Sequence, residues 1–492
     1  MADTAWLIIL YLLSVLAAIH ALLHKRNPPA ALGWIVVCLG LPGFGAFFYL
    51  LLGMNRIRTR ARSWQDGGRG IYPLDSDEQY EAEDSCEVSA PLVVPFKTQN
   101  YQLIRQLSDR VTRRHLLSGN RVELLHNGDR AYPVMLNAIA AARQSIALST
   151  YIFDTQQTGR TFVAALCAAA QRGVEVRVLV DGLGELYSWP LVHRLFVGSK
   201  VQVARFLPFT LRRRGLHLNL RNHRKLLVID GEIGFTGGMN ISHRHLLDNL
   251  PDEQEPAAAR VWPSGRVVDL HFKVGGPVVG QMQETFREDW NFATDETFSG
   301  RNYPPPIVGS NCLCRGISAG PNEEYEKLVW IVVGALNCAR KRVSIMTPYF
   351  IPDRMVVAAL NAAALRGVEV EIILPQKNNL PYVHWASRGS FWELLEYGVK
   401  IYYQPPPFVH SKLLLMDDHY ALIGSANMDP RSQRLNFEFN LELYDEEVNA
   451  SLRHHFDAVR QTARPITLEQ MDGRGLLLKL RDNFFRLFTP FL

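Results

Sequence analysis

Two long apolar runs open the chain and set its N-terminal part apart from the rest. The first covers residues 5–23 with only two polar interruptions, and the second covers residues 30–53 without a charged residue. Each is long enough to cross ~30 Å of hydrocarbon as a helix. We therefore predict a membrane anchor with two transmembrane helices over residues 1–62. Pro42 and Gly43 also allow a helical hairpin that enters and leaves the same face.

Charged residues around these runs bear on cleavage and orientation. Asp3 precedes the first run, no Lys or Arg does, and a second apolar run follows directly, which disfavours a cleaved signal peptide. Lys25 and Arg26 lie in the short connection, and four arginines follow the second run. The positive-inside rule favours a cytoplasmic main body, although the basic connection weakens that preference.

The pattern changes after an acidic, polar stretch that predicts a linker over residues 63–95, and then it repeats. Residues 145–180 pass from a β-branched run through an alanine-rich stretch to a second apolar run, and residues 344–374 repeat this order. Gly173 and Gly367 occupy the same place in the two copies and are typical helix ends. Each copy therefore predicts a strand, a helix and a second buried strand.

The duplication predicts an α/β fold of two pseudo-symmetric units, each a mixed sheet flanked by helices. We place the first unit at residues 96–300 and the second, with a C-terminal amphipathic segment, at residues 301–492. Two copies packed about a pseudo-twofold axis would bring equivalent side chains face to face in one cleft.

Composition adds limits to this prediction. Lys and Arg total 53 against 48 Asp and Glu, and a net charge of +5 on 492 residues does not by itself indicate nucleic acid. The six cysteines form no CxxC pattern with histidines at metal-site spacing, so we predict reduced thiols and no metal. Cys312 and Cys314 are interpreted as ordinary strand or loop residues.

Each repeat continues into one constellation of polar residues at the same spacing. The first copy has His223, Lys225, Asp230, Gly238 and Asn240, and the second has His410, Lys412, Asp417, Ser425 and Asn427. In an extended strand, residues two apart point the same way, so each histidine and its lysine face one anion. The asparagine amides can donate to phosphate, and Gly238 and Ser425 let the backbone approach it. A single HxK is common by chance, whereas its repetition within two matching units predicts catalysis.

These residues make the chain resemble the phospholipase D superfamily, whose members carry paired HxKxxxxD motifs. The resemblance implies that one histidine attacks phosphorus, giving a phosphohistidine, while the other acts as acid and base without a metal or other cofactor. The family's usual order favours His223 as nucleophile and His410 as acid and base. The lysines and asparagines would stabilise the transition state. Asp230 and Asp417 belong to the motif, but we prefer a role that shapes it.

A catalytic histidine needs an acceptor on its other ring nitrogen. In family terms, Glu438 is expected to orient His410. Asp269 is the corresponding candidate for His223.

Within the superfamily the chain is most similar to bacterial cardiolipin synthases. The likeness rests on the N-terminal apolar pair and on residues 25–28, 275–277, 347–352, 424–431 and 436–438. It implies a multi-pass protein of the bacterial inner membrane that joins two phosphatidylglycerols and releases glycerol. Its partners would be anionic phospholipids and the bilayer, not nucleic acid. A hydrolytic phospholipase D, transfer to another alcohol and a membrane-bound nuclease stay as alternatives, and the oligomeric state stays open.

Two further segments suggest contact with lipid. Basic residues between Arg205 and Arg224, with Leu207, Phe209 and Leu211 among them, favour an anionic-lipid docking patch over a solvated loop. Residues 476–492 combine leucines and phenylalanines with basic residues. They predict either an interfacial helix or a packing helix that closes the second unit.

Overall fold

The computed structural model describes residues 2–25, 28–53, 99–208, 220–247, 265–296, 303–320 and 327–489. The chain divides into an N-terminal unit, Met1–Val88, and a C-terminal unit, Ser89–Leu492. The predicted linker lies outside the described residues, and so does most of the basic segment that precedes His223.

The N-terminal unit contains one helix long enough to span a membrane among the residues described. Helix α1 (Ala2–His24) carries an apolar stretch over Trp6–His24 with a mean hydropathy of 2.4. The second apolar run forms α2 (Pro28–Gly40), α3 (Phe44–Phe48) and a π-helical turn, η1 (Tyr49–Gly53). At 1.5 Å per residue, α2 is only ~20 Å long. The second apolar run is therefore divided into short helical segments and is not one continuous helix, while the anchor of two spans stays a prediction.

The break lies at the proline and glycine singled out in the sequence. Gly43 has a φ of 81°, which glycine adopts without strain, and Pro42 has no N–H to continue the helix. Beyond the break the chain turns back along α1. The N–H of Gly43 donates to Ser14 Oγ at 2.9 Å, and six residues later the Tyr49 hydroxyl lies 2.8 Å from His20 Nδ1.

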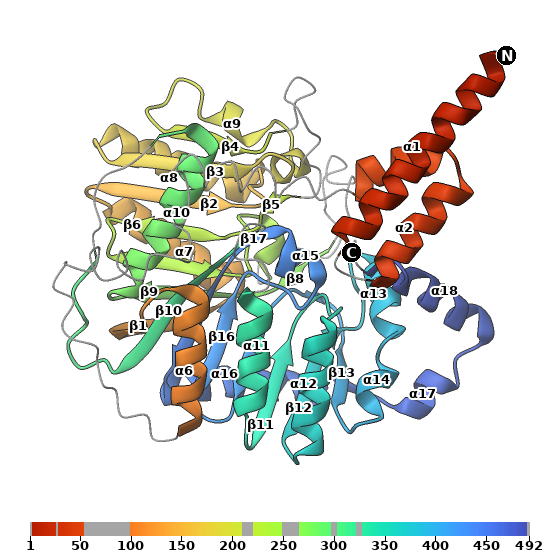
Figure 1. Ribbon diagram of the computed structural model, residues 1–492. Coiled ribbons are helices and arrows are strands. Elements are labelled where there is room, and N and C mark those ends of the chain that lie inside the picture. The colour runs from red at the N-terminus through yellow and green to blue at the C-terminus, as the bar shows by residue number, and fades with distance from the viewer. Residues whose placement is uncertain are drawn as a thin grey trace. The chain divides into compact units, whose positions relative to one another are not determined.

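The C-terminal unit is built on a long mixed sheet that confirms the predicted α/β class (Figure 1). In the first repeat the strand order is β4-β3-β2-β6-β7-β9-β1, and in the second it is β13-β12-β11-β15-β16-β17-β10. The orders match element by element, and the repeats join where β1 pairs with β10.

The strands of the first repeat are β1 (Leu117–His126), β2 (Ser145–Thr150), β3 (Glu175–Asp181), β4 (Gln202–Phe206), β6 (Leu226–Ile229), β7 (Ile233–Gly237) and β9 (Leu270–Gly275). Those of the second are β10 (Cys312–Ala319), β11 (Arg342–Met346), β12 (Glu369–Pro375), β13 (Lys400–Gln404), β15 (Leu413–Met416), β16 (Tyr420–Gly424) and β17 (Asn436–Tyr444), with β18 (Arg464–Ile466) added at the edge beside β13.

Helices cover this sheet, and the inner core is shared by both repeats. The principal helices are α6 (Gln99–Thr112), α7 (Asn127–Ala141), α8 (Gln157–Gln171), α10 (Val278–Thr294), α11 (Lys327–Cys338), α12 (Arg354–Leu365), α13 (Pro381–Arg388), α16 (Glu446–Thr462) and α18 (Leu476–Arg486). One buried cluster joins strand residues of both repeats with side chains of α10 and α16. Although α6 precedes β1, its Tyr101 and Ile104 pack in the core of the second repeat, beside α11 (Figure 1).

Very short parallel strands connect the two repeats at the sites of the paired motifs. Strand β5 (Arg221–Asn222) pairs with Asn436 and Phe437 at the start of β17. Strand β14 (Phe408–Val409) pairs with β8 (Val267–Val268), which ends just before β9. Each motif therefore begins beside a strand end of the other repeat.

Candidate active site

Both histidines are positioned by backbone contacts that cross between the repeats. The N–H of His223 donates to the Phe437 carbonyl at 2.9 Å, and the N–H of His410 donates to the Val268 carbonyl at 2.8 Å. The residue after each acceptor is a carboxylate, Glu438 or Asp269. The register of the short parallel strands thus places each imidazole next to an acid of the opposite repeat.

The resulting histidine–carboxylate pairs are crossed. His223 Nδ1 lies 3.0 and 3.1 Å from the two oxygens of Glu438, and His410 Nδ1 lies 2.8 Å from Asp269 Oδ2. The expectation that Glu438 orients His410 and Asp269 orients His223 is therefore wrong, although the two acids were identified. It assumed that each acid serves a histidine of its own repeat, whereas the parallel strands exchange them.

Gly238 and Ser425, predicted to bind substrate, lie against these acids instead. A Cβ on Gly238 would stand 2.2 Å from Asp269 Oδ1, so glycine is what leaves room for the carboxylate. Ser425 Oγ donates to Glu438 Oε2 at 2.5 Å. Gly238 therefore leaves space for one carboxylate and Ser425 holds the other, while their part in substrate binding stays a prediction.

The two motif lysines are buried and differ in what they touch. Lys225 Nζ donates to the His223 carbonyl at 2.6 Å, and Lys412 Nζ lies 2.9 Å from His410 Nδ1. Burial lowers the pKa of Lys225 to about 7 and that of Lys412 to about 8. Without a bound anion, these ammonium groups have lost much of their hydration and have only nearby carboxylates to offset that loss.

The electrostatic surroundings of the histidines are similar but unequal. Burial lowers the pKa of His223, and Glu438 opposes that shift. Burial and then Lys412 lower the pKa of His410 well below its usual value, with further contributions from Lys225 and His223. His223 therefore faces a carboxylate alone at Nδ1, whereas His410 has a carboxylate and an ammonium group there.

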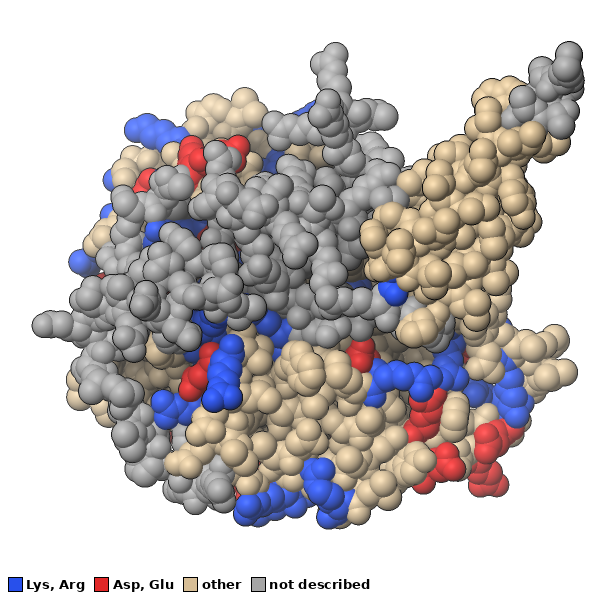
Figure 2. Space-filling model, in the orientation of Figure 1, with Lys and Arg blue, Asp and Glu red and all other residues tan. Residues whose placement is uncertain are grey.

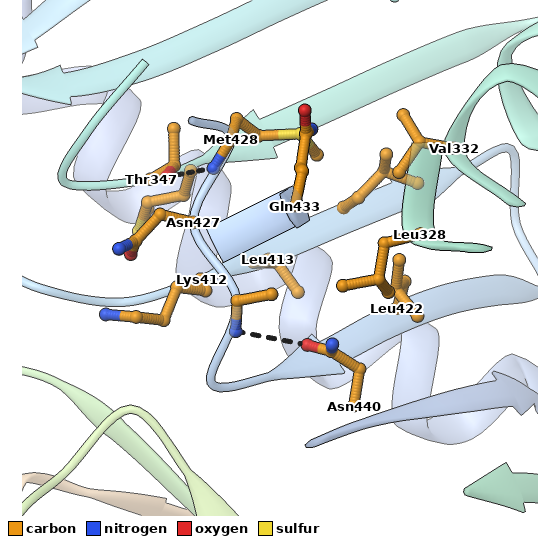
Figure 3. A pocket seen from close by; sticks show the side chains of 13 residues that line it. Leu328, Val332, Thr347, Lys412, Leu413, Leu422, Asn427, Met428, Gln433 and Asn440 are labelled. Atoms are coloured by element: carbon orange, nitrogen blue, oxygen red, sulfur yellow. Dashed lines mark hydrogen bonds between the residues drawn. The ribbon is translucent and has the colours of Figure 1, made fainter. Parts of the chain in front are cut away.

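The two motif asparagines also differ. Asn240 Oδ1 accepts from the N–H of Ile152 at 3.1 Å, which directs its amide N–H groups away from that contact. Asn427 Oδ1 is buried without a partner in the described part of the chain. Asn427 lines a hollow with Lys412 and Thr347, and Figure 3 shows the Lys412 and Asn427 side chains extending to the same side.

Asp230 and Asp417 are not at the reacting centre, although their place in the motif grouped them with the catalytic residues. The Asp230 carboxylate accepts three backbone N–H groups, from residues 143–145, at 2.7–2.9 Å. Asp417 does the same for residues 340–342. Strands β6 and β15 separate them from the histidines, so the preferred shaping role is the one their contacts support.

Aromatic side chains beside the histidines were missed in the sequence. The ring of Tyr151 lies 5.2 Å from that of His223, centroid to centroid, and 5.8 Å from Lys225 Nζ. Tyr349 and Phe408 lie 6.4 and 5.9 Å from the His410 ring. Tyr151 follows strand β2 directly and Tyr349 comes three residues after the end of the repeated strand β11, which was the available signal. The aromatic rings give both imidazoles a partly apolar wall.

Part of the predicted basic docking patch is internal. Arg224 is 2% exposed, and it bonds Asp289 at 2.5 Å, Ser318 Oγ at 2.6 Å and the Glu438 carbonyl at 3.1 Å. Arg205 is paired with the buried Glu185. The remaining basic residues between 209 and 219 lie outside the described residues. Arg224 therefore joins the two repeats rather than meeting lipid.

No group of three or more metal-ligating side chains occurs among the described residues. Cys312 and Cys314 lie on β10 with their sulfurs 3.5 Å apart, and both are free thiols. The chemistry that the described groups offer is nucleophilic and acid–base catalysis by imidazole, with ammonium groups as the positive charge.

The chain is similar to known proteins over nearly its whole length. A family model described as "Cardiolipin synthase, PLD-like domain" matches residues 135–253 and 332–460, and one described as "Phospholipase_D-nuclease N-terminal" matches residues 12–53. Cardiolipin synthase 2 of Staphylococcus epidermidis is 30% identical over 483 residues, which is 97% of this chain and 96% of that protein. Cardiolipin synthase A of Pseudomonas fluorescens is 32% identical over 494 residues, 98% and 97% of the two chains.

Among solved structures, phosphatidylserine synthase of Haemophilus influenzae is similar, with a TM-score of 0.61. It is 16% identical and covers 80% of this chain and 100% of its own, a likeness that concerns the fold. The N-terminal family match and the apolar helix α1 together indicate association with a membrane.

Proposed function

The chain belongs to the phospholipase D-like cardiolipin synthase family, and from that premise we propose that it joins two phosphatidylglycerol molecules and releases glycerol. The observation that carries the proposal is the pair of crossed histidine–carboxylate contacts, His223 with Glu438 and His410 with Asp269. Two imidazoles, each held at Nδ1, leave two Nε2 atoms for one phosphodiester.

In the first step, His223 Nε2 attacks phosphorus and the bond to the glycerol head group breaks. His410 donates a proton to the leaving oxygen, so a phosphatidyl-histidine and free glycerol result. In the second step, the hydroxyl of another phosphatidylglycerol gives its proton to His410 while its oxygen attacks phosphorus. The phosphorus–nitrogen bond breaks, and cardiolipin leaves.

The inequality of the two half-sites supports this division of roles. The carboxylate at His223 Nδ1 keeps the ring electron-rich, which favours nucleophilic attack. Burial, and then Lys412 at His410 Nδ1, lower the pKa of that imidazole, which makes its protonated form a stronger acid. A strong acid suits the protonation of a poor alkoxide leaving group.

Lys225 and Lys412 would stabilise the charge that develops on the phosphoryl oxygens, together with the amides of Asn240 and Asn427. The aromatic residues around the histidines limit access of water. A lipid hydroxyl delivered from the bilayer then competes well for the intermediate, which favours transfer over hydrolysis.

The N-terminal unit supports a topology with one crossing. Helix α1 spans the bilayer, and residues 28–53 enter beside its C-terminal end and return to that end. The contact of Gly43 with Ser14, followed by that of Tyr49 with His20, marks the return. The visible face of this hairpin carries almost no charge (Figure 2).

This topology resolves the ambiguous charge pattern. Lys25 and the four arginines after residue 55 then lie on the same side of the membrane, which the positive-inside rule assigns to the cytoplasm. Residues 54–98 contain no apolar run long enough to cross. The active site is therefore proposed to face the cytoplasm at the inner membrane.

The activity is tested by incubating the purified chain in mixed micelles with phosphatidylglycerol alone, without added metal, and identifying the products by mass. Cardiolipin with an equal amount of glycerol is expected, and the His410→Ala chain serves as the inactive control. Phosphatidic acid as the main product would instead indicate a hydrolase.

The topology is tested with an impermeant thiol reagent on Lys25→Cys and Val308→Cys chains, in intact cells and in inverted membrane vesicles. Val308 is 96% exposed and reports the side of the C-terminal unit. Labelling of both cysteines from the same side supports the returning hairpin. Labelling from opposite sides would support two membrane-spanning segments instead.

A further inference from the structure

Helix α18 is amphipathic in the reverse of the usual sense. A helix that closes a globular unit ordinarily buries its apolar side chains and exposes its charges. In α18 the one buried side chain is that of Asp482, which is 0% exposed. Its large apolar side chains face outward instead.

The charged face is the one that fixes α18 to the protein. Asp482 accepts from Arg474 at 2.6 Å, from Arg388 of α13 at 2.8 Å and from Arg481 at 3.0 Å. Phe485 adds a ring contact with Trp385 of α13 at 5.0 Å. Figure 1 shows α13 and α18 side by side. The buried carboxylate of Asp482 and its arginine partners therefore fix the orientation of α18. The opposite side of the helix faces outward.

The outward face is a continuous apolar surface along the helix and the turn after it. Its side chains are between 43% and 81% exposed and are Leu476, Leu477, Leu478, Leu480, Phe484, Leu487 and Phe488. Scattered single apolar residues are normal on a protein surface, but a contiguous group of this size marks an interaction site.

We propose that this surface of α18 docks into the phospholipid bilayer as a second membrane contact, separate from α1. The chain is already held at a membrane by α1, so a bilayer is within reach of the C-terminal unit. Arg481 follows Leu480 on the same helix with its side chain 32% exposed, and its positive charge suits an anionic head group beside the inserted leucines.

The docking surface is linked to one half of the active site. Phe485 packs on a small cluster formed by Ile351, Val383 and Ala386, and Tyr349 packs on the same cluster. The Tyr349 ring also lies 6.4 Å from the His410 ring. A bilayer against α18 is therefore connected through Phe485, this small cluster and Tyr349 to His410, the proposed acid and base.

The inference is tested in the full chain by labelling a Leu477→Cys variant with an environment-sensitive fluorophore in vesicles containing phosphatidylglycerol. The matched control is Val308→Cys, which is also strongly exposed at 96%. The unsubstituted chain, treated in parallel, corrects for labelling of the native thiols. We expect blue-shifted emission at position 477 that lipid-borne nitroxide quenches, and neither effect at position 308.

Two outcomes would overturn the proposal. One is an emission from position 477 that stays as water-exposed as that from position 308. The other is a blue shift that persists in detergent, grows with protein concentration and is not quenched by nitroxide lipid, since that result assigns the surface to a second copy of the chain. The readout needs no turnover, so it is independent of the proposed transferase activity.

A second variant, Leu477→Ser with Leu480→Ser, tests the role of docking in catalysis. Both positions are exposed, so the fold should be retained. We expect about a tenfold lower rate on vesicle-embedded phosphatidylglycerol, because two apolar side chains no longer enter the bilayer. The rate on a short-chain, water-dispersed substrate should be unchanged. An equal loss on both substrates would contradict membrane docking.

Discussion

Replacing Glu438 by Gln is expected to disable His223, which lies 215 residues away in the sequence. The amide keeps the size of the side chain and can still accept from Ser425, but it removes the charge that His223 Nδ1 contacts at 3.0 Å. It also allows the amide N–H to donate to Nδ1, which favours the tautomer with the proton on Nε2. That tautomer leaves Nε2 without the lone pair needed for attack.

The size of the effect follows from the hydrogen bonds that the substitution removes. A hydrogen bond to a buried charge contributes about 1.5–3 kcal/mol, and the single proton on Nδ1 is shared by the two Glu438 oxygens. A loss of about 3 kcal/mol in the transition state corresponds to about a 10²-fold lower kcat. Asp269→Asn should cause a comparable loss through His410.

The two losses can be told apart with a donor whose leaving group needs no proton, such as a nitrophenyl phosphodiester. Loss of the general acid is then tolerated, whereas loss of the nucleophile is not. With His223 as nucleophile, His410→Ala and Asp269→Asn should recover a single-turnover burst of nitrophenol, after which the phosphohistidine accumulates because the acceptor lacks its base. His223→Ala and Glu438→Gln should give no burst. The crossed pairing is refuted if Glu438→Gln behaves like His410→Ala.

Three further predictions concern charge and stability. The pKa of Lys225 is about 7 and that of Lys412 about 8, so both lysines are partly neutral near pH 8. A bound phosphodiester analogue raises these pKa values, and its binding should therefore take up protons. Calorimetry detects the uptake as binding enthalpies that differ between buffers of different ionisation enthalpy. Arg224→Met removes the buried guanidinium that bonds Asp289 and Ser318 and should cost about 3–5 kcal/mol in unfolding measurements. Asp230→Ala should lower the free energy of unfolding by about 1–3 kcal/mol, because three backbone N–H groups lose their acceptor. Its kcat should stay within roughly a few-fold of the parent value. A much lower kcat in a folded variant would instead assign Asp230 a direct role in catalysis.

Local patterns in the sequence predicted the repeated α/β units and the paired motif because periodicity and spacing are local properties. The strand and helix of each repeat formed where β-branched and alanine-rich stretches indicated. The apolar content of residues 30–53 indicated helices, but composition alone does not show where such a run breaks. The break lies at Gly43, whose N–H contacts Ser14.

The assignment of acids to histidines failed for a different reason. It depends on which strand ends meet across the two repeats, and the strands that decide it, β5 and β14, are only two residues long. Such strands have no periodicity to detect. Likewise, Leu477 and Leu480 of α18 have the spacing of a packing helix, and only the buried Asp482 shows which face points inward.

The crossing of β5 onto β17 also has a consequence for how the protein is made. A nascent chain that has emerged only through the first repeat contains His223 but lacks Glu438, and it holds Asp269 with no His410 to orient. The His410–Asp269 pair needs only β14 beside β8, but the His223–Glu438 pair is completed only when β17, one of the last strands to leave the ribosome, takes its place between β16 and β10. We therefore expect a product that ends before β17 to be inert toward the lipids around it.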